Sequence, residues 1–124
     1  MPFTTLALNG MLDSWVTAEG TLYVALIRTG GTEAVGVGSG GIAYARKAIS
    51  FAAAASGNKP NSTDIVWDNG GATDWSSDID KWKIYDALTS GNELANGNLT
   101  ALRDMSIANA TLTIATGDLD LDLT

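Results

Sequence analysis

The chain has 124 residues, of which 45% are hydrophobic, and its 14 acidic and 7 basic residues give a formal net charge of -7. It contains neither Cys nor His, which excludes disulfides, thiolate metal sites and the usual general base near neutral pH. The acidity disfavours nucleic acid and anionic membrane surfaces as partners, and it favours contact with a basic protein.

The length predicts a single domain over residues 1–124, with residues 1–20 forming an N-terminal helix or arm. The opening sequence MPFTTLALNG has no basic region and no long apolar run, so we expect no signal peptide and synthesis in the cytoplasm. No stretch of the sequence approaches the roughly 20 apolar residues that span a bilayer.

The first predicted element is a short helix over about Leu6 to Val16, because Met11, Leu12, Trp15 and Val16 share one helical face. Gly10 weakens this helix by roughly 1 kcal/mol relative to Ala. We expect the helix to seal one end of a β core.

The segment from Thr21 to Arg28 predicts a strand that is apolar on both faces. Such a strand is either central in a sandwich or covered by another subunit. The following segment, Thr29 to Gly41, contains six glycines and predicts a loop that packs loosely and serves as a contact surface.

Alternating residues from Tyr44 to Phe51 predict the next strand. Lys47 indicates that this strand lies near a sheet edge, and Arg46 is placed to pair with a carboxylate or to stack on an aromatic ring. A turn is expected over residues 57–63, a short strand over Asp64 to Trp67, and a second turn over Asp68 to Ala72.

Two further strands are predicted around a tight connection. Lys81 to Ala87 reads as a half-buried strand, Thr89 to Asn92 as the connection, and Glu93 to Thr100 as the returning strand. Gly97 within the returning strand indicates a bulge or a close approach of another group to the backbone.

The last predicted elements are strands over Ala110 to Thr116 and Leu119 to Thr124, joined at Gly117 and Asp118 into a hairpin. The leucines of the final strand are expected to face inward and its aspartates outward. The whole pattern predicts an all-β fold, an antiparallel sandwich or barrel of about 7–8 short strands with a short N-terminal helix.

Two groups of carboxylates are candidate chemical sites. Asp118, Asp120 and Asp122 could hold Ca²⁺, but the favoured interpretation is the charged solvent side of a terminal strand. Asp74, Asp78 and Asp80 around Trp75 could form a glycosidase pair, but Asp at this density is more typical of turns. We therefore predict a protein that is not an enzyme, with no catalytic residue, no cofactor and no metal ion.

Several motifs together resemble a family of small tailed-bacteriophage virion proteins. These motifs are a YVAL strand at Tyr23, GGIAYARKAISF at Gly40 to Phe51, a hairpin from Trp75 to Ala87, and a final GDL strand at Gly117. Members of that family are described as head-decoration, minor-tail or tail-fibre proteins. The resemblance implies a virion structural protein and supplies no catalytic residues.

The resemblance leads to two functional hypotheses. The first is a capsid decoration protein, also called a cement protein, that binds the outer head surface as a symmetric homo-oligomer, a dimer or trimer. Its partners would be the major capsid protein or other virion proteins. The alternative is a tail or tail-fibre component that contributes to host adhesion, which an exposed Trp67 or Trp75 stacking on sugars would support.

The N-terminal segment and the glycine loop are the predicted contact surfaces. The candidate partner-contact residues are Leu6, Leu8, Met11, Trp15, Gly31, Thr32, Glu33, Val35 and Val37.

Overall fold

A computed structural model describes residues 3–123 and confirms the all-β prediction: eight strands pair antiparallel, and one helix precedes them. The elements are α1 (Thr5–Glu19), β1 (Leu22–Arg28), β2 (Lys47–Ile49), β3 (Asn58–Pro60), β4 (Ile65–Asp68), β5 (Ile79–Tyr85), β6 (Glu93–Arg103), β7 (Thr111–Ile114) and β8 (Asp120–Asp122).

The largest sheet has the strand order β2-β1-β5-β6. In β1, Val24, Ala25, Leu26 and Ile27 are all fully buried, because this strand lies between β2 and β5 and is covered on both faces. The strand β1 is therefore central in the fold, which is the first of the two predicted alternatives; it is not left to be covered by another subunit. Lys47 is exposed on β2, an edge strand of this sheet, as the sequence predicted.

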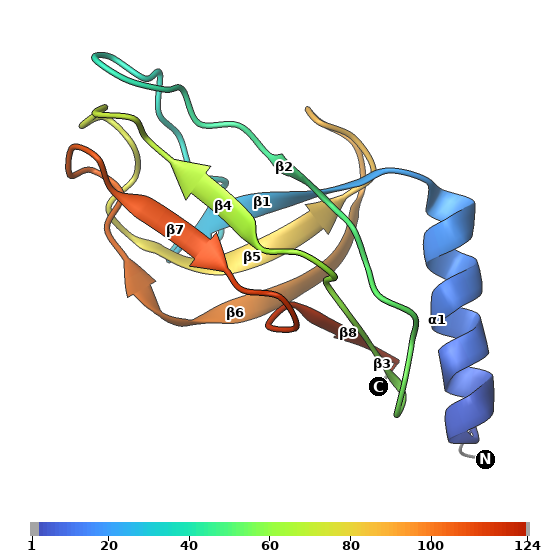
Figure 1. The fold of residues 1–124 in the computed structure, drawn as a ribbon. Helices are drawn as coiled ribbons and strands as arrows, with labels where there is room; N and C mark the ends of the chain where they lie inside the picture. Colours follow the sequence, from blue (N-terminus) through green and yellow to red (C-terminus); the bar gives the residue numbers. More distant parts are fainter. Residues whose placement is uncertain (1–2, 124) are drawn as a thin grey trace.

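Two short ribbons complete the fold, β4 with β7 and β3 with β8 (Figure 1). The β4–β7 ribbon lies over the large sheet, and the β3–β8 ribbon extends toward the helix. The indole N–H of Trp67 on β4 donates to the carbonyl oxygen of Ala45 at 3.0 Å, which joins this layer to the chain entering β2.

One contiguous hydrophobic core runs through these layers. Trp67, Trp75 and Trp82 are at most 8% exposed and supply much of its volume, and Leu12 brings the helix into it. Gly97 on β6 allows the Trp82 ring to lie against the backbone, because a Cβ at this position would collide with the ring. Of the two roles predicted for Gly97, a bulge or a close approach, the structure shows the close approach.

The predicted C-terminal hairpin is wrong: β7 pairs with β4, and β8 pairs with β3. The side chain of Asn61 explains the separation, because its Oδ1 accepts from the N–H groups of Gly117 and Leu119. Its amide nitrogen donates to the carbonyl of Ala115. Asn61, 1% exposed, therefore occupies the corner between the two strands and directs β8 toward the other ribbon.

Three smaller expectations also need correction. The turn predicted over residues 57–63 contains the strand β3. The strand predicted over Tyr44 to Phe51 is only the three residues of β2. Leu119 and Leu121 are buried as predicted, but Leu123 is 48% exposed. Thr124, the last residue of the predicted final strand, lies outside the described residues, as do Met1 and Pro2 of the predicted N-terminal arm.

The predicted helix is confirmed and is longer than expected. Thr4 caps it, because its hydroxyl accepts from the N–H of Ala7, and Gly20 with φ of 77° ends it. The helix stands beside the ribbons at one end of the molecule, and its N-terminus points away from the large sheet (Figure 1).

Candidate partner-contact surfaces

The glycine loop is held near its start by an ion pair between buried Arg46 and half-buried Glu33. Arg46, 8% exposed, donates to both carboxylate oxygens of Glu33, from Nη2 at 2.9 Å and from Nε at 3.1 Å. Its Nη1 donates to the carbonyls of Ala87 and Ser90, and its guanidinium lies 3.8 Å from the centroid of the Tyr85 ring. Both roles that the sequence offered for Arg46, carboxylate pairing and aromatic stacking, are present.

Tyr44 completes this cluster. Its hydroxyl donates to Glu33 Oε2 at 2.9 Å and accepts from the N–H of Leu26 at 3.0 Å. Burial and the nearby Glu33 carboxylate raise the pKa of Tyr44, and the hydrogen bond to Glu33 raises the pKa of Arg46. Both carboxylate oxygens of half-buried Glu33 are therefore engaged by Tyr44 and Arg46, which gives this residue a structural role.

The second half of the glycine loop is also fixed, which corrects the expectation of loose packing. Asp74 accepts hydrogen bonds from the N–H groups of Ser39 and Gly38, both at 3.1 Å, and the bond from Ser39, followed by that from Gly38, lowers the pKa of its carboxyl. Gly36 lies against the Trp75 ring, where a Cβ would collide with ring atoms. The glycines permit close contacts of the loop with the core.

Asn69 joins three loops into one structure, which we call the distal tip and define as residues 36–42, 68–73 and 105–110. Asn69 is fully buried, and its side-chain amide donates to the carbonyls of Met105 at 2.9 Å and Ile107 at 2.7 Å. Its backbone carbonyl accepts from the N–H of Ile42 at 2.8 Å. These loops gather at the end of the molecule opposite α1 (Figure 1).

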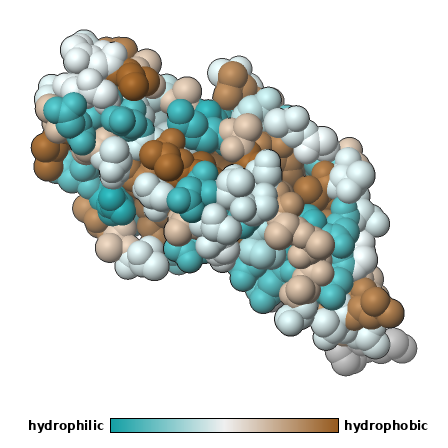
Figure 2. All heavy atoms as spheres, in the orientation of Figure 1, coloured by the Kyte–Doolittle hydropathy of each residue, from teal (hydrophilic) through white to brown (hydrophobic). Residues whose placement is uncertain are grey.

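The distal tip exposes apolar side chains from two of its loops. Val37 is 82% exposed, Ile107 is 61% exposed and Ile42 is 53% exposed. Hydrophobic atoms lie between polar ones at this end of the molecule in Figure 2, at its upper left. Large apolar side chains that are held open on a hydrogen-bonded framework are typical of a protein contact surface.

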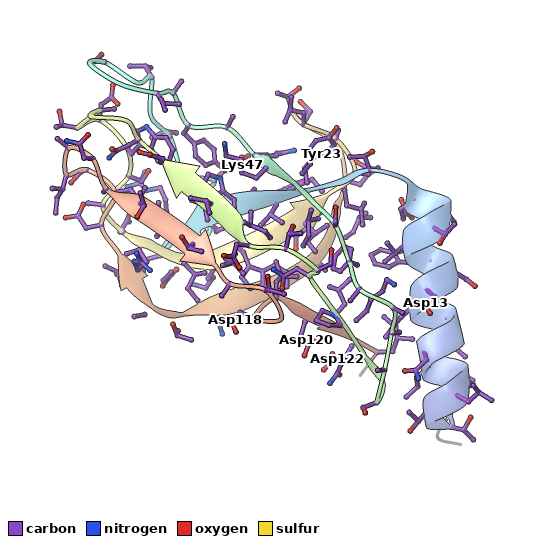
Figure 3. All side chains as sticks on the ribbon, viewed as in Figure 1. Asp13, Tyr23, Lys47, Asp118, Asp120 and Asp122 are labelled. Carbon is purple, nitrogen blue, oxygen red and sulfur yellow. The ribbon has the colours of Figure 1, made fainter. Side chains whose placement is uncertain are left out.

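The opposite end is formed by the helix, which polar contacts attach to the chain around β3. Lys59, 6% exposed, donates from Nζ to Asp13 Oδ1 and to the carbonyl of Ala52. Asp13 also accepts from the N–H of Ala54, and Asn9 accepts from the N–H of Gly57. In Figure 3 Asp13 lies on the side of α1 that faces this segment.

The hydrogen bond from Lys59, followed by that from Ala54, lowers the pKa of Asp13. Its carboxylate is therefore charged at neutral pH and fixed toward the β layers.

The other side of α1 faces solvent, and we call it the outer face. Its residues are Leu6, Gly10, Met11, Ser14, Thr17 and Ala18, all exposed. None of them carries a charge. Phe3, just before the helix, is 63% exposed and Leu6 is 82% exposed, so the outer face is apolar toward its N-terminal end.

The predicted contact residues fall into two groups. Six are exposed: Leu6, Met11, Gly31, Thr32, Val35 and Val37. Three are not: Leu8 is half-buried, Trp15 packs against the core, and Glu33 is bound to Arg46 and Tyr44. Of the six exposed residues, Leu6 and Met11 lie on the outer face and Val37 lies on the distal tip.

Sequence reasoning missed Ile42 and Ile107 as tip residues. Their positions depend on Asn69, which lies in a segment read simply as a turn. An Asn followed by two glycines signals a turn, but it does not indicate which distant carbonyls the amide will bind.

The other candidate sites are accounted for by local contacts. Asp78 pairs with Arg28 at 2.9 Å and Asp80 with Lys81 at 3.1 Å, while Asp74 binds the glycine loop. Asp118, Asp120 and Asp122 follow one another along the turn and β8 (Figure 3). Within residues 3–123, no group of three or more carboxylates is arranged to hold a metal ion.

The tryptophans bear on the sugar-binding alternative. Trp67 is fully buried, Trp75 is 4% exposed, and its indole N–H donates to the carbonyl of Ile42 at 2.8 Å. Neither ring can stack on a sugar in this conformation, so the observation that would have supported glycan adhesion is missing for both.

A family model described as Podophage GP4 fiber I protein gp80 matches residues 4–122, nearly the whole chain. No curated protein matches it. Over residues 3–123, no helix has the length and apolar character needed to cross a membrane.

Proposed function

Because this chain belongs to the family of the podophage GP4 fiber I protein gp80, and is thus a phage structural protein, we propose that it is a fiber component that uses its two ends differently. The helical end is for assembly with other virion subunits. The distal tip is for contact with a partner outside the fiber.

The exposed apolar side chains of the distal tip are the main support for this proposal. Val37, Ile42 and Ile107 are exposed on loops that buried Asn69 and the Asp74 carboxylate hold in place. A pre-organised apolar surface loses little conformational entropy on binding, which suits repeated weak contacts. The chain acts by contact and not by catalysis, since the carboxylates that suggested a glycosidase are engaged in structural hydrogen bonds and ion pairs.

A pair of substitutions tests the role of the tip. Val37→Asp places a charge on the tip, and Val66→Asp places the same charge on β4, where Val66 is 45% exposed. We expect phage carrying Val37→Asp to assemble normally and to adsorb to host cells poorly, while Val66→Asp phage behaves like the parent. Normal adsorption of the Val37→Asp phage would contradict the proposal.

Capsid decoration is the second candidate, because the net charge of -7 favours docking on a basic lattice. Localisation in a reconstruction of the virion separates the two: a few copies on fibers support the first, and many copies on the head support the second.

Salt adds an independent test. We expect occupancy to survive about 1 M salt, because the exposed side chains of the tip and the outer face are mostly uncharged, whereas charge-led docking would be screened.

A further inference from the structure

We propose that the gap between β6 on one side and β7 and β8 on the other is a groove that binds an extended segment of another virion subunit by strand addition. The segment is basic and carries apolar side chains at alternate positions. Its identity as part of a virion subunit rests on the proposed function, and the groove deepens the assembly role of the helical end because α1 forms part of its wall. The groove does not depend on the role of the tip.

Strand β6 has a free edge. Within residues 3–123 it pairs with β5 alone, and it is the last strand of the large sheet. It has 11 residues, more than any of the other seven strands, and it contains no Lys or Pro. The other edge strand, β2, has only three residues and carries exposed Lys47, and both features discourage pairing with a further chain. The edge of β6 has neither feature and is suited to accept an added strand.

The regular part of this edge lies between two hollows. Bulges interrupt the pairing with β5 at Leu94 and after Asn98, so residues 95–98 form the regular part. A hollow of about 360 Å³ lies at one end, between β6 and β8, and a hollow of about 70 Å³ lies at the other, between β6 and β7. Within residues 3–123, β7 pairs with β4 alone and β8 with β3 alone. A strand laid along residues 95–98 therefore reaches both hollows.

Apolar side chains that belong to the core or pack against it line both hollows. They are Leu12, Trp15 and Leu121 in the larger hollow, and Trp82, Leu112 and Ile114 in the smaller. Alternate side chains of a strand point to the same face of a sheet. An added strand with apolar residues at alternate positions would therefore place side chains in both hollows.

Carboxylates outnumber cations along the groove. Glu93 and Asp122 line the larger hollow, and Asp118 and Arg103 line the smaller. Lys83 pairs with Glu93 at 2.9 Å, whereas neither Asp118 nor Asp122 forms an ion pair within residues 3–123. These two carboxylates attract a basic segment. A second copy of the chain would instead bring a further net charge of -7.

Amide hydrogen exchange of the purified chain tests strand addition with a model peptide. The probe is a nine-residue peptide of alternating valine and lysine with both ends blocked. We expect it to slow exchange within residues 95–98 by about tenfold or more, because carbonyls of the added strand bind free N–H groups of β6. Exchange in β2 should not change. The matched control is the same peptide with N-methylated valines, which has lost backbone donors and should have no effect.

Two variants locate the binding site. Leu123→Lys places a cation on the wall of the larger hollow, where Leu123 is 48% exposed, and Val66→Lys places one on β4, where Val66 is 45% exposed. Leu123→Lys should weaken peptide binding by about tenfold and Val66→Lys should not, while both keep the parent unfolding temperature. No slowing of exchange by about 1 mM peptide, equal slowing by the N-methylated peptide, or equal effects of the two variants would overturn the groove.

The charge and the source of the occupant are tested separately. A valine–glutamate peptide should bind about tenfold more weakly than the valine–lysine peptide, and equal binding would refute a basic occupant. Residues 95–98 should also exchange more slowly in assembled virions than in the purified chain. Slow exchange that depends on the concentration of the purified chain would identify a second copy and refute the proposed partner. Failure of the peptide test leaves the fiber assignment intact, because localisation in the virion tests that assignment.

Discussion

Arg46 and Glu33 are joined by two hydrogen bonds, at 2.9 and 3.1 Å, across a site where the arginine is almost completely buried. The same guanidinium binds the carbonyls of Ala87 and Ser90 and lies over Tyr85. One side chain therefore connects the glycine loop, the chain entering β2 and the connection between β5 and β6.

Replacing Arg46 with Lys should destabilise the fold although the charge is kept. A lysine ammonium cannot make the two-point pair and also reach both carbonyls, so buried acceptors are left unpaired. We expect a loss of about 1–3 kcal/mol in the free energy of unfolding, measured in urea. Arg103→Lys is the control, because Arg103 is exposed and donates one hydrogen bond, to Thr111; its effect should be small. Equal losses would contradict the role assigned to Arg46.

Asn69→Ala should loosen the distal tip. The substitution removes the donors to Met105 and Ile107, and the unpaired carbonyls cost about 2 kcal/mol. Amide hydrogen exchange should become faster at Ile42 and Gly71 and stay unchanged in β1. Asn98→Ala, at an exposed position of β6, should alter neither stability nor exchange. If hydrogen exchange at Ile42 is unchanged in the Asn69→Ala variant, Asn69 does not hold the loops of the distal tip together.

Gly97→Val should destabilise the protein despite the high β propensity of valine. Its side chain would meet the Trp82 ring, which is 8% exposed and confined by the core. Overpacking of this kind typically costs about 1–3 kcal/mol. Gly30→Ala is the control, because a Cβ there meets nothing within 4 Å. A stable Gly97→Val variant would mean that the ring can move aside.

Acid should destabilise the protein. Hydrogen bonds lower the pKa values of Asp13, Asp64 and Asp74 below the ordinary 3.8, so the folded state holds these carboxyls charged more strongly than the unfolded state does. This contribution is present above the unfolded pKa and is lost as pH falls through the lower folded values. The melting temperature should therefore be steady from pH 7 to 5 and fall from pH 4 downward. Asp74→Asn should reduce that fall, and an equal fall in this variant would exclude Asp74 as a contributor.

High pH should destabilise the protein through ionisation of Tyr44. Burial and Glu33 raise the pKa of Tyr44 above its ordinary value of 10.0, so the unfolded state loses this proton first. Stability is therefore complete below pH 10 and declines as pH rises above it. Unfolding in urea at pH 8 and pH 11 measures the decline, which Tyr44→Phe should make smaller. If the Tyr44→Phe protein loses as much stability between pH 8 and pH 11 as the parent does, groups other than Tyr44 cause the loss.

The sequence by itself determined the fold class, the N-terminal helix and the apolar strand at β1, and it offered a close approach at Gly97 as one of two alternatives. Local periodicity or a single glycine predicts each of these features, because alternating or helical spacing of apolar residues indicates which face of one element is buried. The family motifs likewise indicate a virion protein, since their order along the chain can be read without knowing how they pack.

The predicted return of β6 beside β5 is confirmed, but only the tertiary structure decided how the other strands pair and where the tip lies. The turn at Gly117 looks like a hairpin, but Asn61, more than fifty residues earlier, binds both sides of it and separates the strands. Asn69 likewise gathers loops that are far apart in sequence. A buried amide must satisfy its donors and acceptors wherever folding brings suitable partners, and that choice depends on distant segments that no local pattern encodes.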